Sequence, residues 1–298
     1  MKLYFLLLIA LIGLFACNSK KDFDRKELAS LESAFENNRV DSTYDKLLTR
    51  YLEIMQEHKD NKKIVEEMLF KAAQASKKMD NCRQLVIFLN NLIKNHYERT
   101  DTPDNVVEMI NCLRKIEKSY AADILSICFS EAFPNHPSKV DLLSGLQRQQ
   151  SSEEFLAELA KSMFPDTGSY NKDVAFNYVD ACEAYALVLP NSEKSPEFLF
   201  SAAQTAKLLQ TYDKCISLFD WIIEKYPTHP KAENACFMKA FLFDNDLKDT
   251  AIARKYYTEF IGKYPKSEFV DDAQILILNL GKTEEQILEE IQKKNQAQ

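Results

Sequence analysis

Apolar residues recur along this chain with the spacing of one helix face. Leu47, Leu48, Tyr51, Leu52 and Met55 show the pattern, because positions i, i+1, i+4, i+5 and i+8 lie on one side of an α-helix. The same spacing predicts helices near residues 24–37, 43–58, 64–78, 82–96, 104–116, 119–132, 138–148, 152–164, 171–188, 196–209, 212–225, 230–244, 248–263, 267–280 and 284–294. Glycine occurs only five times, and proline falls between the apolar segments. The chain is therefore predicted to be all-α.

One segment of the chain is repeated. The eleven residues 67–77 return as residues 197–207 with seven identities, and the residues that follow align without a gap. Self-similarity on this scale indicates a supersecondary unit that is used several times. Stacked repeats build extended binding surfaces more often than catalytic pockets.

The first seventeen residues predict export and a lipid anchor. A short basic start, Met1-Lys2, precedes an apolar run from Leu3 to Phe15 that is too short to span a bilayer. The following Ala16-Cys17 resembles a bacterial lipobox, which implies cleavage before Cys17 and lipid attachment to its sulfur. An ordinary signal peptide is the alternative. Two or more acyl chains would hold the protein stably on a membrane.

The residues that follow Cys17 indicate which membrane, and which side of it, would carry the anchored protein. Asn18 stands where many inner-membrane lipoproteins carry aspartate, so the resemblance favours the outer membrane. Lys20-Lys21 gives a basic stretch, which favours the periplasmic leaflet over the cell surface.

The charge of the chain argues against one class of partner, and its cysteines raise the question of disulfides. The formal net charge is −7, and no dense basic patch occurs, so nucleic acid is not expected as a partner. Besides Cys17, six cysteines are scattered over predicted helices without paired spacing: Cys82, Cys112, Cys128, Cys182, Cys215 and Cys236. We expect free, buried thiols that act as small hydrophobes, with disulfides as the alternative for an exported protein.

The last third of the chain resembles tetratricopeptide repeats. In a first unit over 196–229, the apolar and small positions of the motif fall on Leu199, Ala202, Ala203, Ala206, Cys215, Phe219 and Ile222, with a closing Pro227. In a second unit over 234–267 they fall on Phe237, Ala240, Phe241, Ala253, Tyr257, Phe260 and Pro265. Two positions depart from the motif: Cys215 replaces the usual alanine, and Asp244 stands where an aromatic is usual.

The turn after each second helix also recurs. It reads Tyr226-Pro227 and Tyr264-Pro265, with weaker copies at Phe133-Pro134 and Leu189-Pro190. This turn resembles that of outer-membrane repeat lipoproteins, notably the lipoprotein subunit of the β-barrel assembly machinery and the periplasmic cell-division coordinator. Proline disfavours a continued helix, and a Ser, Thr or Asn after it can cap the next one.

The resemblance implies a right-handed α-solenoid of antiparallel helix pairs, closed by a C-terminal capping helix. Thr283 and Gln286 form the capping-box start of that last helix. The expected organisation is a signal peptide over 1–16, a lipidated N-terminus and tether over 17–23, degenerate repeats over 24–148, and a repeat domain over 149–298.

The repeated segment contains a candidate binding surface. In this family, positions four, seven and eight of the first helix pack inward, which explains Leu69, Ala72 and Ala73 and their counterparts Leu199, Ala202 and Ala203. Positions two, five, nine and twelve face the concave groove, and here they are Glu67, Phe70, Gln74 and Lys77 with Glu197, Phe200, Gln204 and Lys207. These eight residues are predicted to bind an extended or helical peptide. The alternative is that Glu, Gln and Lys are ordinary helix formers and Phe is ordinary core.

Candidate chemistry is sparse. The four histidines, His58, His96, His136 and His229, are dispersed, and none has metal-ligand spacing. His136 and His229 occupy the same turn, which favours a capping role. No motif for a nucleophile, phosphate loop or metalloprotease occurs. We expect a non-enzyme without metal or cofactor.

Two functions fit these features. The first is a lipid-anchored periplasmic scaffold whose groove binds another envelope protein, in outer-membrane assembly or division. The second is a cell-surface lipoprotein that captures glycans or another nutrient beside a transporter. A glycan binder needs exposed aromatic platforms, and the single tryptophan, Trp221, lies at a position expected to face a neighbouring repeat. This favours the scaffold.

Overall fold

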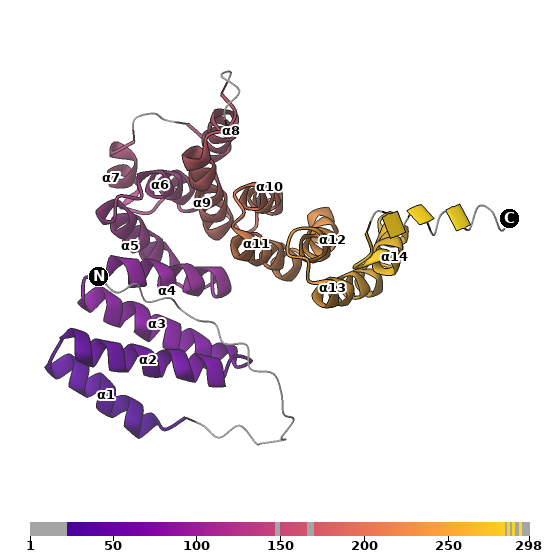
Figure 1. The fold of residues 1–298 in the computed structure, drawn as a ribbon. Coiled ribbons are helices and arrows are strands. Elements are labelled where there is room, and N and C mark those ends of the chain that lie inside the picture. Colours follow the sequence, from indigo (N-terminus) through magenta and orange to yellow (C-terminus); the bar gives the residue numbers. More distant parts are fainter. Residues whose placement is uncertain are drawn as a thin grey trace. The chain divides into compact units, whose positions relative to one another are not determined.

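The structure is a computed structural model, which describes residues 23–146, 150–165 and 170–283 and six residues beyond Thr283. The described part contains fourteen α-helices and no strand (Figure 1). The predicted all-α fold is therefore confirmed. The signal peptide over 1–16 and Cys17 lie outside the described residues.

The helices follow the predicted ranges closely. They are α1 (Arg25–Asn37), α2 (Asp41–Glu57), α3 (Lys62–Lys78), α4 (Cys82–Asn95), α5 (Thr102–Lys115), α6 (Ser119–Ala132), α7 (Lys139–Ser144), α8 (Ser152–Ser162), α9 (Lys172–Val188), α10 (Lys194–Leu208), α11 (Tyr212–Lys225), α12 (Pro230–Asn245), α13 (Thr250–Lys263) and α14 (Val270–Asn279). Of the predicted last helix, the capping box is present: Gln286 N–H donates to the Thr283 hydroxyl, and Thr283 N–H donates to the Gln286 side chain.

The chain divides into two compact units, one ending at Gln84 and the other beginning at Leu85, inside α4. In the first unit α1 packs on α2, and α2 on α3. In the second unit most packing again joins chain neighbours, from α5 against α6 to α13 against α14. The consecutive packing fits a solenoid of helix pairs. The predicted division of the repeats at residues 148/149 stays a prediction.

The turns inside the helix pairs share one backbone feature. Asp80, Glu117, Gln210 and Lys248 have positive φ values of 50–61° and follow α3, α5, α10 and α12 respectively. At the Gln210 turn, Gln210 N–H donates to Lys207 O and Thr211 N–H donates to Ala206 O. This is the pattern of a Schellman C-cap, which usually places glycine in the left-handed position. The turns at Asp80 and Glu117 repeat these two hydrogen bonds, whereas after α12 Asp249 N–H donates to Phe243 O instead. None of the four left-handed positions holds glycine.

The turns between the helix pairs share a second feature. Each of these turns begins at the aromatic or Leu residue that ends the second helix, which we call position 1. The residue at position 4 donates its backbone N–H to the carbonyl of position 1. The side chain of the same residue accepts the backbone N–H of position 6. The accepting residues are His136, Ser192, His229 and Ser267. The capping role predicted for His229 is thereby confirmed, since His229 is the N-cap of α12. His136 instead accepts the N–H of Ser138, which is itself the N-cap residue of α7.

The predicted packing positions form the core. Leu199, Ala202, Ala203, Ala206, Cys215, Phe219 and Ile222 are buried, and so are Ala240, Ala253, Tyr257 and Phe260 in the next pair. Leu69, Ala72 and Ala73 are buried in the first unit as well. Asp244, the departure from the motif, accepts a hydrogen bond from the hydroxyl of Tyr257 at 3.3 Å. The acidic side chain therefore has a structural use inside the pair.

The cysteines divide into two groups. Four are free and buried, as expected: Cys128, Cys182, Cys215 and Cys236. Cys82 and Cys112 are disulfide-bonded, so the expectation of free thiols is wrong for these two. Their spacing gave no sign of this, because disulfide formation depends on tertiary neighbours and not on spacing along the chain.

Among the described residues, no helix combines the length and apolarity that crossing a membrane requires.

Candidate binding surfaces

Three of the four predicted groove residues on α10 contact α12, the first helix of the next pair. The Lys207 ammonium lies 3.0 Å from the carboxylate of Asp246, the C-cap residue of α12, whose backbone N–H donates to Leu242 O. The Glu197 carboxylate lies 3.3 Å from the Lys231 ammonium near the start of α12. The Lys207 ammonium also lies 5.2 Å from the centroid of the Phe241 ring on α12. We call this face, with these residues and with Phe200 and Gln204, the α10–α12 surface.

Phe200 is the packing residue of this surface. Its side chain is buried, its ring centroid lies 5.9 Å from that of Phe219 on α11, and the Lys231 ammonium lies 4.9 Å from its centroid. Gln204, by contrast, is exposed. The alternative of ordinary core therefore applies to Phe200, and Gln204 is the most accessible of the four residues.

The matching set on α3 lies in the first unit and forms a separate surface. Glu67 is held between the side chains of Arg25 on α1 and Lys71, at 3.2 and 3.3 Å. Burial alone would raise the pKa of Glu67, but the hydrogen bonds from Arg25 and Lys71 outweigh burial and lower this pKa. Phe70 is half-buried, whereas Gln74 and Lys77 are exposed. The eight predicted residues therefore form two surfaces, one in each unit.

A cavity of about 250 Å³ adjoins Gln74 between α1, α2 and α3. Its charges are neutralised within the unit, because Lys71 lies 2.8 Å from Glu32 and Lys78 bonds Glu36. The Tyr51 hydroxyl also donates to Glu32, at 3.0 Å. Such a pocket offers few free charges to a ligand.

The second unit contains a cleft of about 320 Å³ between α4, α5, α6, α9 and α11, which we call the Glu183 cleft. Its floor is apolar and includes Met109 and Leu125. At its rim the Lys214 ammonium lies 2.9 Å from the Glu183 carboxylate. Burial raises the pKa of Glu183, and the Lys214 charge only partly offsets this. The cleft therefore joins apolar surface to a rim whose charges are largely paired.

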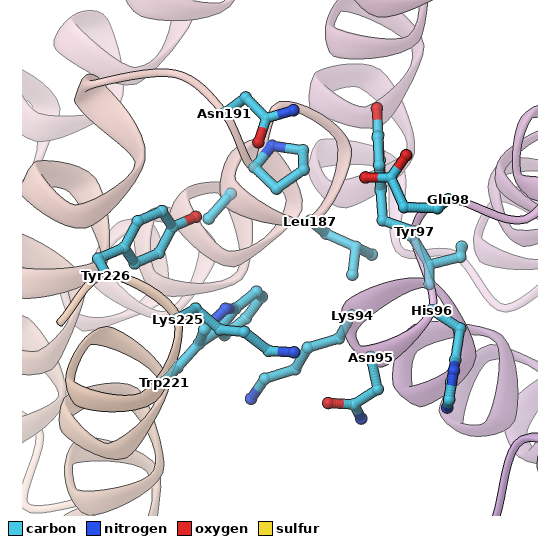
Figure 2. Close-up of a pocket in the computed structure, with 13 residues that line it drawn as sticks. Lys94, Asn95, His96, Tyr97, Glu98, Leu187, Asn191, Trp221, Lys225 and Tyr226 are labelled. Atoms are coloured by element: carbon cyan, nitrogen blue, oxygen red, sulfur yellow. The ribbon is translucent and has the colours of Figure 1, made fainter. Parts of the chain in front are cut away.

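A further cavity of about 260 Å³ lies between the C-terminal ends of α4, α9 and α11, and we call it the Trp221 cavity (Figure 2). The Lys94 ammonium lies 4.0 Å from the centroid of the Trp221 ring, within the range of a cation–π contact. The Tyr97 hydroxyl closes one wall by donating to Val188 O at 2.7 Å. Burial raises the pKa of Tyr226, another lining residue, to about 12.

Sequence reasoning missed both cavities of the second unit. Lys94 and Trp221 come from helices that are far apart in the chain, so no local spacing links them. Trp221 is buried, with 4% of the residue exposed, and its ring contacts Lys94 on α4. A lysine next to a lone tryptophan is visible only after folding.

A family model of the tetratricopeptide repeat matches residues 235–267. The matched segment comprises most of α12, all of α13 and the turn through Ser267. These residues form a tetratricopeptide repeat. Proteins with such repeats commonly bind protein partners. A comparison with curated proteins finds no match.

The core of the repeat is aromatic. Phe237 on α12 packs against Tyr257 and Phe260 on α13, with ring centroids 5.9 and 5.5 Å apart, and against Phe269 at 5.2 Å. Ala240 and Ala253 are buried where the two helices approach each other. Small residues at the crossing and aromatics around it hold the pair together. The repeat is thus a rigid base for the α10–α12 surface.

The described residues contain no group of three or more His, Cys, Asp or Glu side chains that could hold a metal ion. The two turn histidines use Nδ1 to accept backbone N–H groups, and their Nε2 atoms lie 3.4 Å from Asp104 and 4.0 Å from Glu197. His229 caps α12, and His136 holds the turn before α7.

Proposed function

We propose that this protein is a lipid-anchored scaffold of the bacterial cell envelope, which binds another envelope protein through its helical repeats and catalyses no reaction. The observation that carries the proposal is the tetratricopeptide repeat at 235–267, packed against a similarly built pair, α10 and α11. The first helices of the two pairs, α10 and α12, also contact each other directly. Two successive pairs thereby present a continuous face to a partner.

The α10–α12 surface is the proposed docking site for the partner. Glu197, Lys207, Lys231 and Asp246 pair with one another across the two helices, which fixes the spacing of the helices without a partner. A preformed surface loses little conformational entropy when it binds. Gln204 lies on this face and is exposed, so it can hydrogen-bond the backbone of an extended or helical peptide.

Site-specific photocrosslinking tests this docking site in living cells. A photoreactive phenylalanine analogue replaces Gln204 in the full-length protein, and a matched variant carries it at Arg254, an exposed position on α13. Both positions are exposed, so neither replacement removes a core contact. We expect one discrete crosslinked partner from position 204 and a much weaker band from position 254. Equal labelling at both positions would reject the α10–α12 surface as the docking site.

The anchor is tested separately. Replacement of Cys17 by Ser removes the proposed acceptor of the lipid and should move the protein from the membrane fraction to the soluble fraction. If the variant stays in the membrane fraction, the anchor proposal is wrong. Protease treatment of intact cells then tests the leaflet. Protection is expected for a periplasmic scaffold, whereas degradation would support the alternative of a surface-exposed lipoprotein that captures glycans or nutrients.

A further inference from the structure

Two ammonium groups lie at the Trp221 cavity without a carboxylate partner. Figure 2 shows the side chains of Lys94 and Lys225 extending toward each other from α4 and α11, beside the Trp221 ring. Among the described residues, neither lysine forms an ion pair or a hydrogen bond through its side chain. The carboxylates of Glu183 and Glu224 act on Lys94 only from beyond ion-pair distance.

This arrangement contrasts with that of three other lysines of low exposure. Lys71, Lys214 and Lys239 each bond a carboxylate, at 2.6–2.9 Å. Lys94 is half-buried, and burial lowers its pKa despite the opposing charges of Glu183 and Glu224. Partial burial of an unpaired ammonium beside another ammonium costs free energy. Glu98 is the one carboxylate among the residues that line the cavity, so Lys94 and Lys225 leave a net charge of +1 there, in a chain of net charge −7. Such a local positive charge is suited to a negative ligand.

We propose that the Trp221 cavity binds the oxyanion group of a small ligand or of a ligand's end, either a carboxylate or a phosphate. Lys94 and Lys225 neutralise the oxyanion, and the side-chain amide of Asn191, which also lines the cavity, can donate hydrogen bonds to it. Asn95 Nδ2 already donates one hydrogen bond to Asn91 O and has a second N–H for the ligand. The apolar wall, which includes Leu187, accepts a short alkyl portion next to the charged group.

The dimensions and the location agree with a small ligand group. A cavity of about 260 Å³ holds a group the size of an amino-acid residue, but not a folded element. The lining residues come from α4, α9, α11 and their following turns, so the site shares no residue with the α10–α12 surface. The inference therefore stands independently of the proposed docking surface.

The single tryptophan of the chain makes the site directly observable. Trp221 lines the cavity, so its fluorescence reports on a charge that binds next to Lys94. The full-length protein, purified in detergent, is titrated with N-acetylglycine, with inorganic phosphate and with the uncharged N-acetylglycinamide. All titrations are made at constant ionic strength, because salt screens such interactions. We expect a saturable change with N-acetylglycine or phosphate and none with the amide. Which of the two anions binds more tightly identifies the chemical source of the oxyanion.

Variants separate binding from general effects on the fold. Lys225→Gln changes an exposed residue and should weaken anion binding about tenfold, since one charge-assisted contact is lost. Lys94→Gln together with Lys225→Gln should abolish it, while Lys94→Arg should retain it. Lys266→Gln, at an exposed turn outside the cavity, is the matched control and should bind like the unchanged protein. An equal response to the amide, no saturation with either anion, or equal binding by the Lys225→Gln variant would overturn the proposal.

Discussion

The pair formed by Lys239 and Asp220 makes a quantitative prediction about stability. Lys239 on α12 has only 10% of its side chain exposed, and its ammonium lies 2.6 Å from the Asp220 carboxylate on α11. The same ammonium lies 4.0 Å from the centroid of the Tyr256 ring on α13. One buried cation therefore connects three consecutive helices.

The two halves of this pair should respond differently to replacement. Asp220→Asn leaves a buried ammonium with a neutral partner, and removing one member of a buried pair costs about 3–5 kcal/mol. Asp220 has 39% of its side chain exposed, so water can replace part of the lost interaction and the expected cost falls to about 2–3 kcal/mol. Lys239→Met keeps the apolar stem of the side chain and leaves a carboxylate that water can reach. Its cost should stay within about 1 kcal/mol.

Urea denaturation of the purified variants measures these free energies of unfolding. The double variant, Lys239→Met with Asp220→Asn, should resemble Lys239→Met alone, because no buried charge remains. Glu224→Gln, which changes an exposed carboxylate on the same helix, is the control and should lie within about 0.5 kcal/mol of the unchanged protein. If Asp220→Asn costs no more than Lys239→Met, the reasoning from burial is refuted.

Three further predictions concern a turn, a carboxylate and the thiols. Gln210→Gly removes the strain of a left-handed residue and should raise the free energy of unfolding by about 0.5–1 kcal/mol, whereas Gln210→Val should lower it; thermal unfolding of both variants decides. The folded-state pKa of Glu183 is raised, so its charge should cost stability as pH rises from the unfolded value of about 4.3 through the folded value. Glu183→Gln should therefore flatten the fall in stability over this range, and an unchanged pH profile would contradict the assignment. Thiol labelling should be slow in the folded protein, because burial raises the pKa of four free cysteines, and should reach all four only after denaturation: Cys128, Cys182, Cys215 and Cys236.

The helices could be predicted because their burial follows a strict period. Each pair hides one face of each helix, so residues such as Ala202 and Ala203 recur at fixed spacing. The turns with proline were also visible, since Tyr226 and Tyr264 precede proline and end their helices with ψ values of 47° and 60°. Local chemistry determines these features, and a single sequence contains it.

The turns inside the pairs could not be predicted in the same way. Their left-handed positions hold acidic, basic or amide residues, such as Glu117 and Gln210, where glycine would have given a signal. In these turns the packing of the two helices imposes the backbone conformation on a residue that does not prefer it. The sequence therefore showed where helices end but not how the chain reverses.

The candidate sites were only partly readable, because their contacts join distant elements. Position in the motif correctly assigned Phe200 to α10, but its burial against Phe219 and under Lys231 depends on the neighbouring helices. The ion pair of Lys207 with Asp246 likewise crosses from one pair to the next. Lys94 and Trp221 have no relation in sequence at all. Sequence spacing predicts the helix face on which a side chain lies, but it does not predict which side chains of other helices contact it.

Consecutive packing in the second unit has a consequence for how this protein comes apart. The repeat at 235–267 is held mainly by α11 on one side and α14 on the other, so its loss removes few contacts from α5, α6 and α9. Unfolding can therefore start at the C-terminal end and advance one helix at a time, each step opening only a neighbour. Amide hydrogens should accordingly exchange fastest in α14 and progressively more slowly toward α9. A substitution that destabilises one helix pair should therefore affect mainly that pair and its direct neighbours.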